Sequence, residues 1–181
     1  MSKQVLFLIL LNILCFETYA QKGLNNLSIN GEATLPYFQN DQGMGFFLKG
    51  LYGIGRNGQL ILSAGISRFN SNTSKETNIT TRVIPFLLGY KRNFQKFFIE
   101  SKIGIGELGG KISKAGDLQR PSIAAVFGGL AAGYTIKRFN FGINFLTAHG
   151  IENTSAGVWY NKNFHYTSVF VGYDLFAKSN H

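Results

Sequence analysis

The stretch FFIESKIGIG, residues 97–106, alternates with a period of two, which is the pattern of a β-strand. One face of such a strand carries four apolar side chains, those of Phe97, Ile99, Ile103 and Ile105. The other face carries Glu100 and Lys102. A soluble antiparallel sheet would turn the apolar face to a core and the charged face to water. A closed sheet in a membrane would do the reverse, with apolar side chains toward lipid and charged side chains toward the interior.

The composition fits one domain that carries few charges. The chain has 181 residues, of which 45% are apolar and 15% charged, whereas soluble domains usually carry about 25% charged residues. There are 18 Lys+Arg and 9 Asp+Glu, so the formal net charge is +9. A basic chain can bind nucleic acid, but the cations here are scattered along the sequence and form no block. We therefore expect no nucleic-acid partner.

The first 20 residues have the parts of a secretory signal peptide. Lys3 gives a positive start, residues 5–16 (VLFLILLNILCF) form an apolar run, and residues 18–20 end in a small alanine. The run is too short for a membrane-spanning helix, which needs about 20 apolar residues. We therefore expect residues 1–20 to be a cleaved signal. Because Cys15 is the only cysteine, the mature chain would then carry no thiol.

Eight segments after the signal have the strand period. They are residues 27–35, 45–55, 60–69, 81–91, 97–106, 122–136, 139–147 and 165–176. The connections between them alternate in length. Long connections (PYFQNDQGM, NSNTSKETN, ELGGKISKAGDLQRP and AHGIENTSAGVWYNKN) take turns with short ones (RNGQ, RNFQK and KR). An up-and-down membrane barrel sorts its connections in this way, with short turns on one rim and longer loops on the other.

Strand length and the placement of aromatic residues also favour a membrane barrel. Apart from residues 122–136, the segments are about 9–13 residues long, which suits a tilted strand that crosses a bilayer. Aromatic residues gather near the segment ends, where membrane barrels carry girdles: Tyr37, Phe38, Tyr52, Phe69, Tyr90, Phe97, Phe139, Trp159, Tyr160, Tyr166 and Phe176. Hydrocarbon cannot satisfy an open sheet edge. The sequence therefore predicts an all-β fold, a closed antiparallel up-and-down transmembrane β-barrel of eight strands over residues 21–176, with a tail at 177–181.

The alternation assigns each strand residue to a face of the barrel. We expect charged side chains inside at four positions: Glu32, Lys49, Glu100 and Lys102. We expect side chains facing lipid at nine positions: Phe46, Leu48, Leu62, Ile99, Ile103, Phe141, Ile143, Val169 and Val171. Glycines on the inner face should leave room for the long charged side chains, and the candidates are Gly65, Gly104, Gly142 and Gly172.

Pro85 interrupts this simple pattern, because proline cannot donate to a strand ladder. A β-bulge at Pro85 would resolve the conflict and would reverse the facing of the residues before it. In that case Val83 would face lipid and Arg82 would turn inward toward Glu100.

These features resemble the small eight-stranded outer-membrane β-barrel proteins of Gram-negative bacteria, over about residues 24–176. The likeness rests on TYA-QKG at residues 18–23, on the hairpin rhythm and on the last strand, FVGYDLF, residues 170–176. That strand is similar to the terminal signal that the barrel-assembly machinery reads, although AKSNH follows where relatives often end. The resemblance implies a location in the cell outer membrane. It implies as partners outer-membrane lipid and lipopolysaccharide, and the barrel-assembly machinery during insertion.

The sequence offers little for catalysis, and we predict no catalytic residue, cofactor or metal. It has no histidine pair at metal-ligand spacing, no acidic cluster and no phosphate-binding glycine loop. Lipid A deacylases of the same class carry a His and a Ser two apart on one strand, with an acidic partner. Here Thr167 stands at that distance from His165, and Ser168 falls on the opposite face. No acid is placed by the sequence to orient the imidazole, and the nearest carboxylates in sequence are those of Glu152 and Asp174.

The main functional hypothesis is a non-enzymatic outer-membrane scaffold that presents extracellular loops for surface interaction. Eight strands are too few for a general porin. The long connections carry five cations that would meet outer-leaflet phosphates or an acidic partner: Lys75, Lys111, Lys114, Arg120 and Lys162. One alternative is an outer-leaflet lipid-modifying barrel enzyme that uses His165. The other is a secreted soluble barrel that binds an apolar ligand in its lumen.

Overall fold

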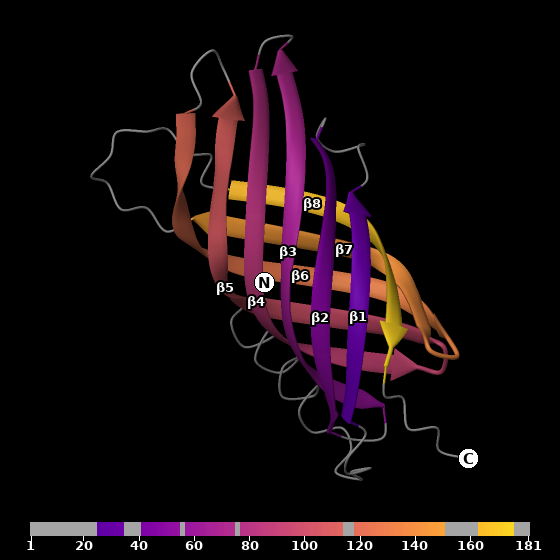
Figure 1. The fold of residues 1–181 in the computed structure, drawn as a ribbon. Coiled ribbons are helices and arrows are strands. Elements are labelled where there is room, and N and C mark those ends of the chain that lie inside the picture. Colours follow the sequence, from indigo (N-terminus) through magenta and orange to yellow (C-terminus); the bar gives the residue numbers. More distant parts are fainter. Residues whose placement is uncertain are drawn as a thin grey trace, which may run out of the picture.

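The computed structural model describes residues 25–34, 41–54, 57–74, 77–113, 118–150 and 163–175. They form eight strands: β1 (Asn25–Thr34), β2 (Asp41–Gly53), β3 (Gly58–Ser74), β4 (Thr77–Phe94), β5 (Phe97–Ser113), β6 (Leu118–Ile136), β7 (Phe139–Gly150) and β8 (Asn163–Asp174). Each strand pairs antiparallel with the next, and β8 pairs with β1 to close a barrel (Figure 1). The predicted fold class is therefore confirmed. The expected signal at 1–20 and tail at 177–181 lie outside the described residues.

The closing seam joins β1 to β8 along seven cross-strand pairs, from Ser28 opposite Asp174 to Thr34 opposite Ser168. Next to the Ser28–Asp174 end of this seam, Leu175 N donates to Leu27 O over 2.7 Å. β1 therefore begins, and β8 ends, at the rim where the short turns lie. Among the described residues, no helix is long and apolar enough to cross a membrane.

Two of the short connections are two-residue turns. The sequence predicted this length for KR, whereas RNFQK is shorter than predicted because β4 continues to Phe94. Gln95 and Lys96 join β4 to β5, and Lys137 and Arg138 join β6 to β7. Gln95 has a φ of 58° and Lys137 a φ of 55°, the left-handed region that tight hairpin turns require. Neither residue is glycine, so the paired strands on each side hold them in a conformation that they rarely adopt alone.

Strands β3 to β6 run farther toward the long-loop rim than the sequence predicted. β3 continues to Ser74 and β4 begins at Thr77, while β5 continues to Ser113 and β6 begins at Leu118. The predicted loops NSNTSKETN and ELGGKISKAGDLQRP are therefore mostly strand. Their Asn, Ser, Thr and Gly content is typical of loops, but cross-strand pairing with a neighbour overrides composition. Figure 1 shows these strands rising past the ends of β7 and β8.

The outer surface is apolar around the barrel. All nine positions predicted to face lipid lie on this surface, with exposed fractions between 40% and 68%. Further exposed apolar side chains complete the belt, among them Ile66, Phe86, Leu88, Ile105, Leu130, Phe139 and Phe145. A soluble monomer rarely exposes an apolar patch of more than a few hundred Å². An apolar belt carried by strands β2 to β8 is instead the surface that acyl chains cover.

The interior is only partly polar. Near the long-loop rim, a buried apolar cluster fills the barrel: Phe69, Val83, Leu87, Leu108, Ala125, Phe127, Leu146, Ala148 and Tyr166. Phe69 and Tyr166 were expected in an outer girdle, and that prediction is wrong. Their rings pack together inside, with centroids 4.7 Å apart, because their odd or even position in the strand decides their face. Tyr37, Phe38, Trp159, Tyr160 and Phe176 lie outside the described residues.

The predicted bulge at Pro85 does not form. The register of β4 with β3 and with β5 is the same before and after Pro85, so no extra residue is inserted. The alternation therefore continues through the proline. Val83 is fully buried in the lumen, and Arg82 lies outside, where it contacts Glu107 and not Glu100.

The role predicted for the inner-face glycines is also wrong, because at none of the four positions is the neighbour a charged side chain. A Cβ at Gly65 would collide with the ring of Phe47, one at Gly142 with the ring of Phe170, and one at Gly104 with a β4 carbonyl. These glycines make room for aromatic rings and for close backbone approach. Only at Gly172 is the neighbour polar, and it is the amide of Asn30.

We predict that Ile103→Arg destabilises the barrel in a bilayer, because it places a cation on the middle of the outer belt. The expected loss in the free energy of unfolding is about 2–4 kcal/mol, against about 0–1 kcal/mol for Phe94→Arg beside the β4–β5 turn. Urea unfolding in phosphatidylcholine vesicles measures both. Equal losses at the two positions would contradict the placement of the belt.

Candidate functional site

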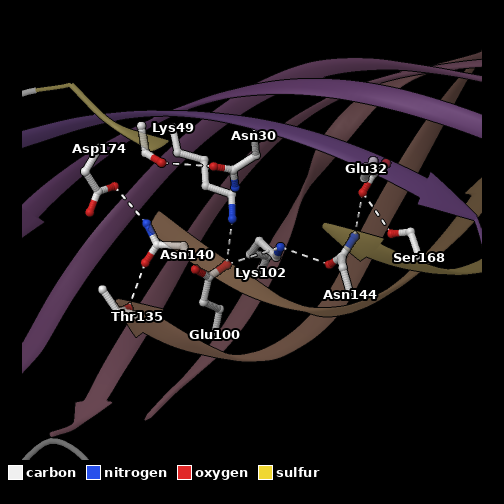
Figure 2. Close-up of polar contacts among 11 residues, drawn as sticks. Asn30, Glu32, Lys49, Glu100, Lys102, Thr135, Asn140, Asn144, Ser168 and Asp174 are labelled. Atoms are coloured by element: carbon white, nitrogen blue, oxygen red, sulfur yellow. Dashed lines mark hydrogen bonds and ion pairs between the residues drawn. The ribbon is translucent and has the colours of Figure 1, made fainter. Parts of the chain in front are cut away.

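The centre of the lumen is held by one carboxylate shared between two lysines. Lys49 Nζ on β2 lies 3.0 Å from Glu100 Oε2 on β5, and Lys102 Nζ lies 3.4 Å from the same oxygen. All three side chains are buried, and Glu100 is only 2% exposed. Figure 2 shows them converging inside the barrel. A buried charge needs a partner, and here each ammonium group has one.

Lys102 also links this group to the closing seam. Its Nζ donates to Asn144 Oδ1 on β7 over 3.0 Å, and Asn144 Nδ2 donates to Glu32 Oε2 on β1 over 3.2 Å (Figure 2). A chain of polar contacts therefore crosses the lumen from β2 through β5 and β7 to β1.

Glu32 is satisfied by neutral donors. Besides Asn144, its carboxylate accepts from Ser67 Oγ at 2.9 Å, Tyr166 OH at 3.0 Å and Ser168 Oγ at 2.9 Å. These donors come from β3 and β8, so Glu32 ties the seam strand β1 across the barrel. The sequence predicted its inward position but not these partners. Ser67 and Ser168 share the inward parity of their strands, which is the signal that could have identified them.

A third polar group lies nearer the short-turn rim. Asn140 Nδ2 donates to Asp174 Oδ1 over 2.9 Å, and Thr135 Oγ1 donates to Asn140 Oδ1 over 2.8 Å. Lys91 Nζ lies 4.0 Å from the centroid of the Phe98 ring, a cation–π contact. Lys91 was not predicted as an inner charge, although its parity matches that of Leu87.

The charges inside the barrel balance. Of the residues that the structure describes, six charged side chains are buried, three of them lysines and three carboxylates: Lys49, Lys91, Lys102, Glu32, Glu100 and Asp174. Little space is left between them. Two hollows beside Lys49 each have a volume of about 10 Å³, which is room for about one water molecule.

The residues proposed for a lipid-modifying enzyme do not come together. His165 is exposed on the outer face, where its ring stacks parallel to that of Phe145. Ser168 is fully buried and donates to Glu32, so a pairing with His165 is excluded. Asp174 binds Asn140 inside the barrel.

Among the residues that the structure describes, the remaining candidates form no catalytic or metal-binding group. Thr167 shares the face of His165 but is half-buried, and Glu152 lies outside the described residues. No group of three His, Cys, Asp or Glu in the described ranges could hold a metal ion. The side chains of the five loop cations, Lys75, Lys111, Lys114, Arg120 and Lys162, also lie outside the described part.

Solved structures share the barrel fold of this chain. Neisserial surface protein A superposes with a TM-score of 0.60 at 9% identity, over 83% of this chain and 97% of that one. Ail, the attachment invasion locus protein of Yersinia pestis, solved with the heparin analogue sucrose octasulfate, gives 0.56 at 13% identity, over 83% and 96%. The N-terminal β-barrel domain of Pseudomonas aeruginosa OprF gives 0.54 at 12% identity, over 84% and 99%.

The chain has the fold of a small outer-membrane β-barrel. Its sequence matches no protein-family model and no curated protein. The apolar belt requires a membrane around the barrel, and closed antiparallel barrels of this kind are the fold of outer membranes. The cell outer membrane is therefore its location, with the belt against lipid.

We predict that Glu100→Gln strongly destabilises the barrel, because it leaves two buried lysines without their shared counterion. The expected loss in the free energy of unfolding is about 3–5 kcal/mol. The matched control is Glu107→Gln, which breaks an exposed ion pair with Arg82 and should cost about 1 kcal/mol or less. Urea unfolding in vesicles compares them, and similar losses would contradict a stabilising role for the inner network.

Proposed function

We propose that the protein is a non-enzymatic outer-membrane scaffold that presents its long-loop rim for interaction at the cell surface. The observation that carries this proposal is the filled lumen. An eight-strand ring is just wide enough for side chains to fill, and here an apolar cluster and a balanced polar network occupy it. Between the described residues, a lumen filled in this way leaves room for neither a solute path nor a ligand, so we assign recognition to the rim.

The cross-linked interior supports this role by making the barrel rigid. Glu100 joins β2 to β5, and Glu32 joins β1 to β3, β7 and β8. Recognition residues in proteins are often on loops that a rigid scaffold positions. The ends of strands β3 to β6 at this rim reach beyond β7 and β8 (Figure 1).

The partner class that fits the rim is anionic. Residues 111–120, at the β5–β6 hairpin, include Lys111, Lys114 and Arg120 and one acidic residue, Asp117. Ail has the same fold and was solved with a sulfated sugar, the heparin analogue sucrose octasulfate. A sulfated or phosphorylated polysaccharide on a host or a neighbouring cell is therefore our proposed partner. Contact with lipopolysaccharide, and insertion by the barrel-assembly machinery, belong to the same proposal.

The other two functional hypotheses find less support. The enzyme would need an acid and a nucleophile beside His165, and Ser168 and Asp174 are both bonded inside the barrel. A secreted barrel for an apolar ligand would need an apolar chamber and a polar outer surface, whereas the outer surface here is an apolar belt.

Cells that display the protein should bind heparin-coated beads, and the binding should fall as salt is raised. The triple variant Lys111→Gln, Lys114→Gln, Arg120→Gln should lose this binding. Lys96→Gln, Lys137→Gln, Arg138→Gln removes the same charge at the short turns and should retain it. Binding that does not differ between the two variants, or no binding by the natural chain, would contradict an anionic partner.

The filled lumen makes a second prediction. The purified barrel in a planar bilayer should give no stable ion conductance, because buried side chains block the path. Glu100→Gln should also give none where it folds, since Phe69, Phe127 and their neighbours still fill the rim-side half. Stepwise channel openings by the natural chain would contradict the scaffold proposal.

A further inference from the structure

Two arginines face each other on the outside of the barrel. Arg68 on β3 and Arg82 on β4 are direct cross-strand partners, and both are exposed. Like charges at such positions destabilise a sheet. Arg82 is partly neutralised, since its Nη2 lies 2.6 Å from Glu107 Oε1 and donates to Ser122 Oγ over 3.4 Å. Within the described part of the chain, no carboxylate or other acceptor contacts Arg68.

The pair stands at the boundary between the apolar belt and the polar rim. The next outward cross-strand pair toward the long loops is Asn70 with Thr80, joined by a hydrogen bond of 3.0 Å from Thr80 Oγ1 to Asn70 Oδ1. Asn70 is exposed. In the other direction the outward side chains are apolar. A membrane barrel at this height meets the headgroups of the outer leaflet.

From the arginines toward the short-turn rim, the outer face of β3 and β4 carries a column of apolar side chains. Ala64 stands opposite Phe86, and Leu62 stands opposite Leu88. Phe86, Leu62 and Leu88 are more than half exposed. Ala64 is the small member of this column. The two strands therefore carry a cationic head above an apolar strip, the complement of a lipid that has an anionic headgroup.

We propose that Arg68 and Arg82 bind the phosphate of a phosphorylated outer-leaflet lipid, whose acyl chains lie along this column. The planar guanidinium fork matches phosphate oxygens in paired hydrogen bonds. A phosphate monoester carries about −1.5 to −2 charges near pH 7, so it neutralises two facing arginines better than a singly charged diester. The bound phosphate would replace the missing counterion of Arg68. This inference rests on the proposed function, in which the barrel lies in the outer membrane and contacts lipopolysaccharide.

The test compares stability in vesicles of defined lipid. The natural chain, Arg68→Gln and Arg92→Gln are refolded into phosphatidylcholine, with or without phosphatidic acid, and unfolded with urea. Arg92 is the control because it is on the same face of β4, but its cross-strand neighbours, Gly58 and Ile99, are uncharged. Phosphatidylglycerol at equal surface charge tests a diester, and inorganic phosphate in phosphatidylcholine tests the free ion.

In phosphatidylcholine alone, Arg68→Gln should be at least as stable as the natural chain, because it removes a repulsion. Phosphatidic acid should raise the unfolding midpoint of the natural chain and of Arg92→Gln, since a ligand that binds only the folded state stabilises it. Arg68→Gln should lose that rise. Phosphatidylglycerol should give a smaller rise, and inorganic phosphate should give none.

An equal rise in all three proteins would mean general attraction to a charged surface and would overturn the lipid site. An equal rise with phosphatidylglycerol would overturn the preference for a monoester, and a rise with inorganic phosphate would overturn the lipid as its source. Insertion is followed separately by the shift in gel migration on heating. A chain that never gives the folded band in vesicles would overturn the membrane role itself, whereas a lost lipid effect in an inserted barrel overturns only this inference.

Discussion

Hydrocarbon offers no hydrogen bonds, and this constraint shapes the whole molecule. An unsatisfied backbone group in that layer costs several kcal/mol, so the last strand must pair with the first, as β8 does with β1. The same layer excludes charge from the outer face. The outer face in that layer therefore carries apolar side chains, whereas Glu32, Lys49, Glu100 and Lys102 point inward. The closure of the barrel and its apolar outer face therefore both follow from the surrounding hydrocarbon.

The inward charges then meet a second constraint, because a narrow ring has no bulk water to solvate them. Three lysines balance three carboxylates, and Glu32 takes four neutral donors. These groups and their hydrogen-bond partners occupy one part of the lumen, and aromatic and aliphatic side chains fill the rest. The side chains of the interior therefore stabilise the fold and are not available to bind a partner. Recognition is left to the rim and the outer face, where Arg68 lacks a protein partner among the described residues.

Local pattern predicted what depends on local geometry. Alternation assigned the face of Ile103, Phe141 and Glu100 correctly, since strand parity is fixed by the backbone. It could not supply partners that folding brings together, such as Ser168 for Glu32, which is 136 residues away. Aromatic composition misplaced Phe69 and Tyr166, whose parity turns them inward. Polar composition also made the predicted strands β3 to β6 too short. Pairing with a neighbour extends a strand through residues that are otherwise typical of loops.

Tryptophan quenching by lipid tests the inverted polarity most directly. The natural chain has one tryptophan, Trp159, which Trp159→Phe removes. In that background, Ile103→Trp places the indole on the belt, and Phe127→Trp places it in the lumen. In vesicles of phosphatidylcholine brominated on its acyl chains, the Ile103→Trp fluorescence should be strongly quenched and the Phe127→Trp fluorescence should not. Quenching of Phe127→Trp with Ile103→Trp unaffected would contradict the account.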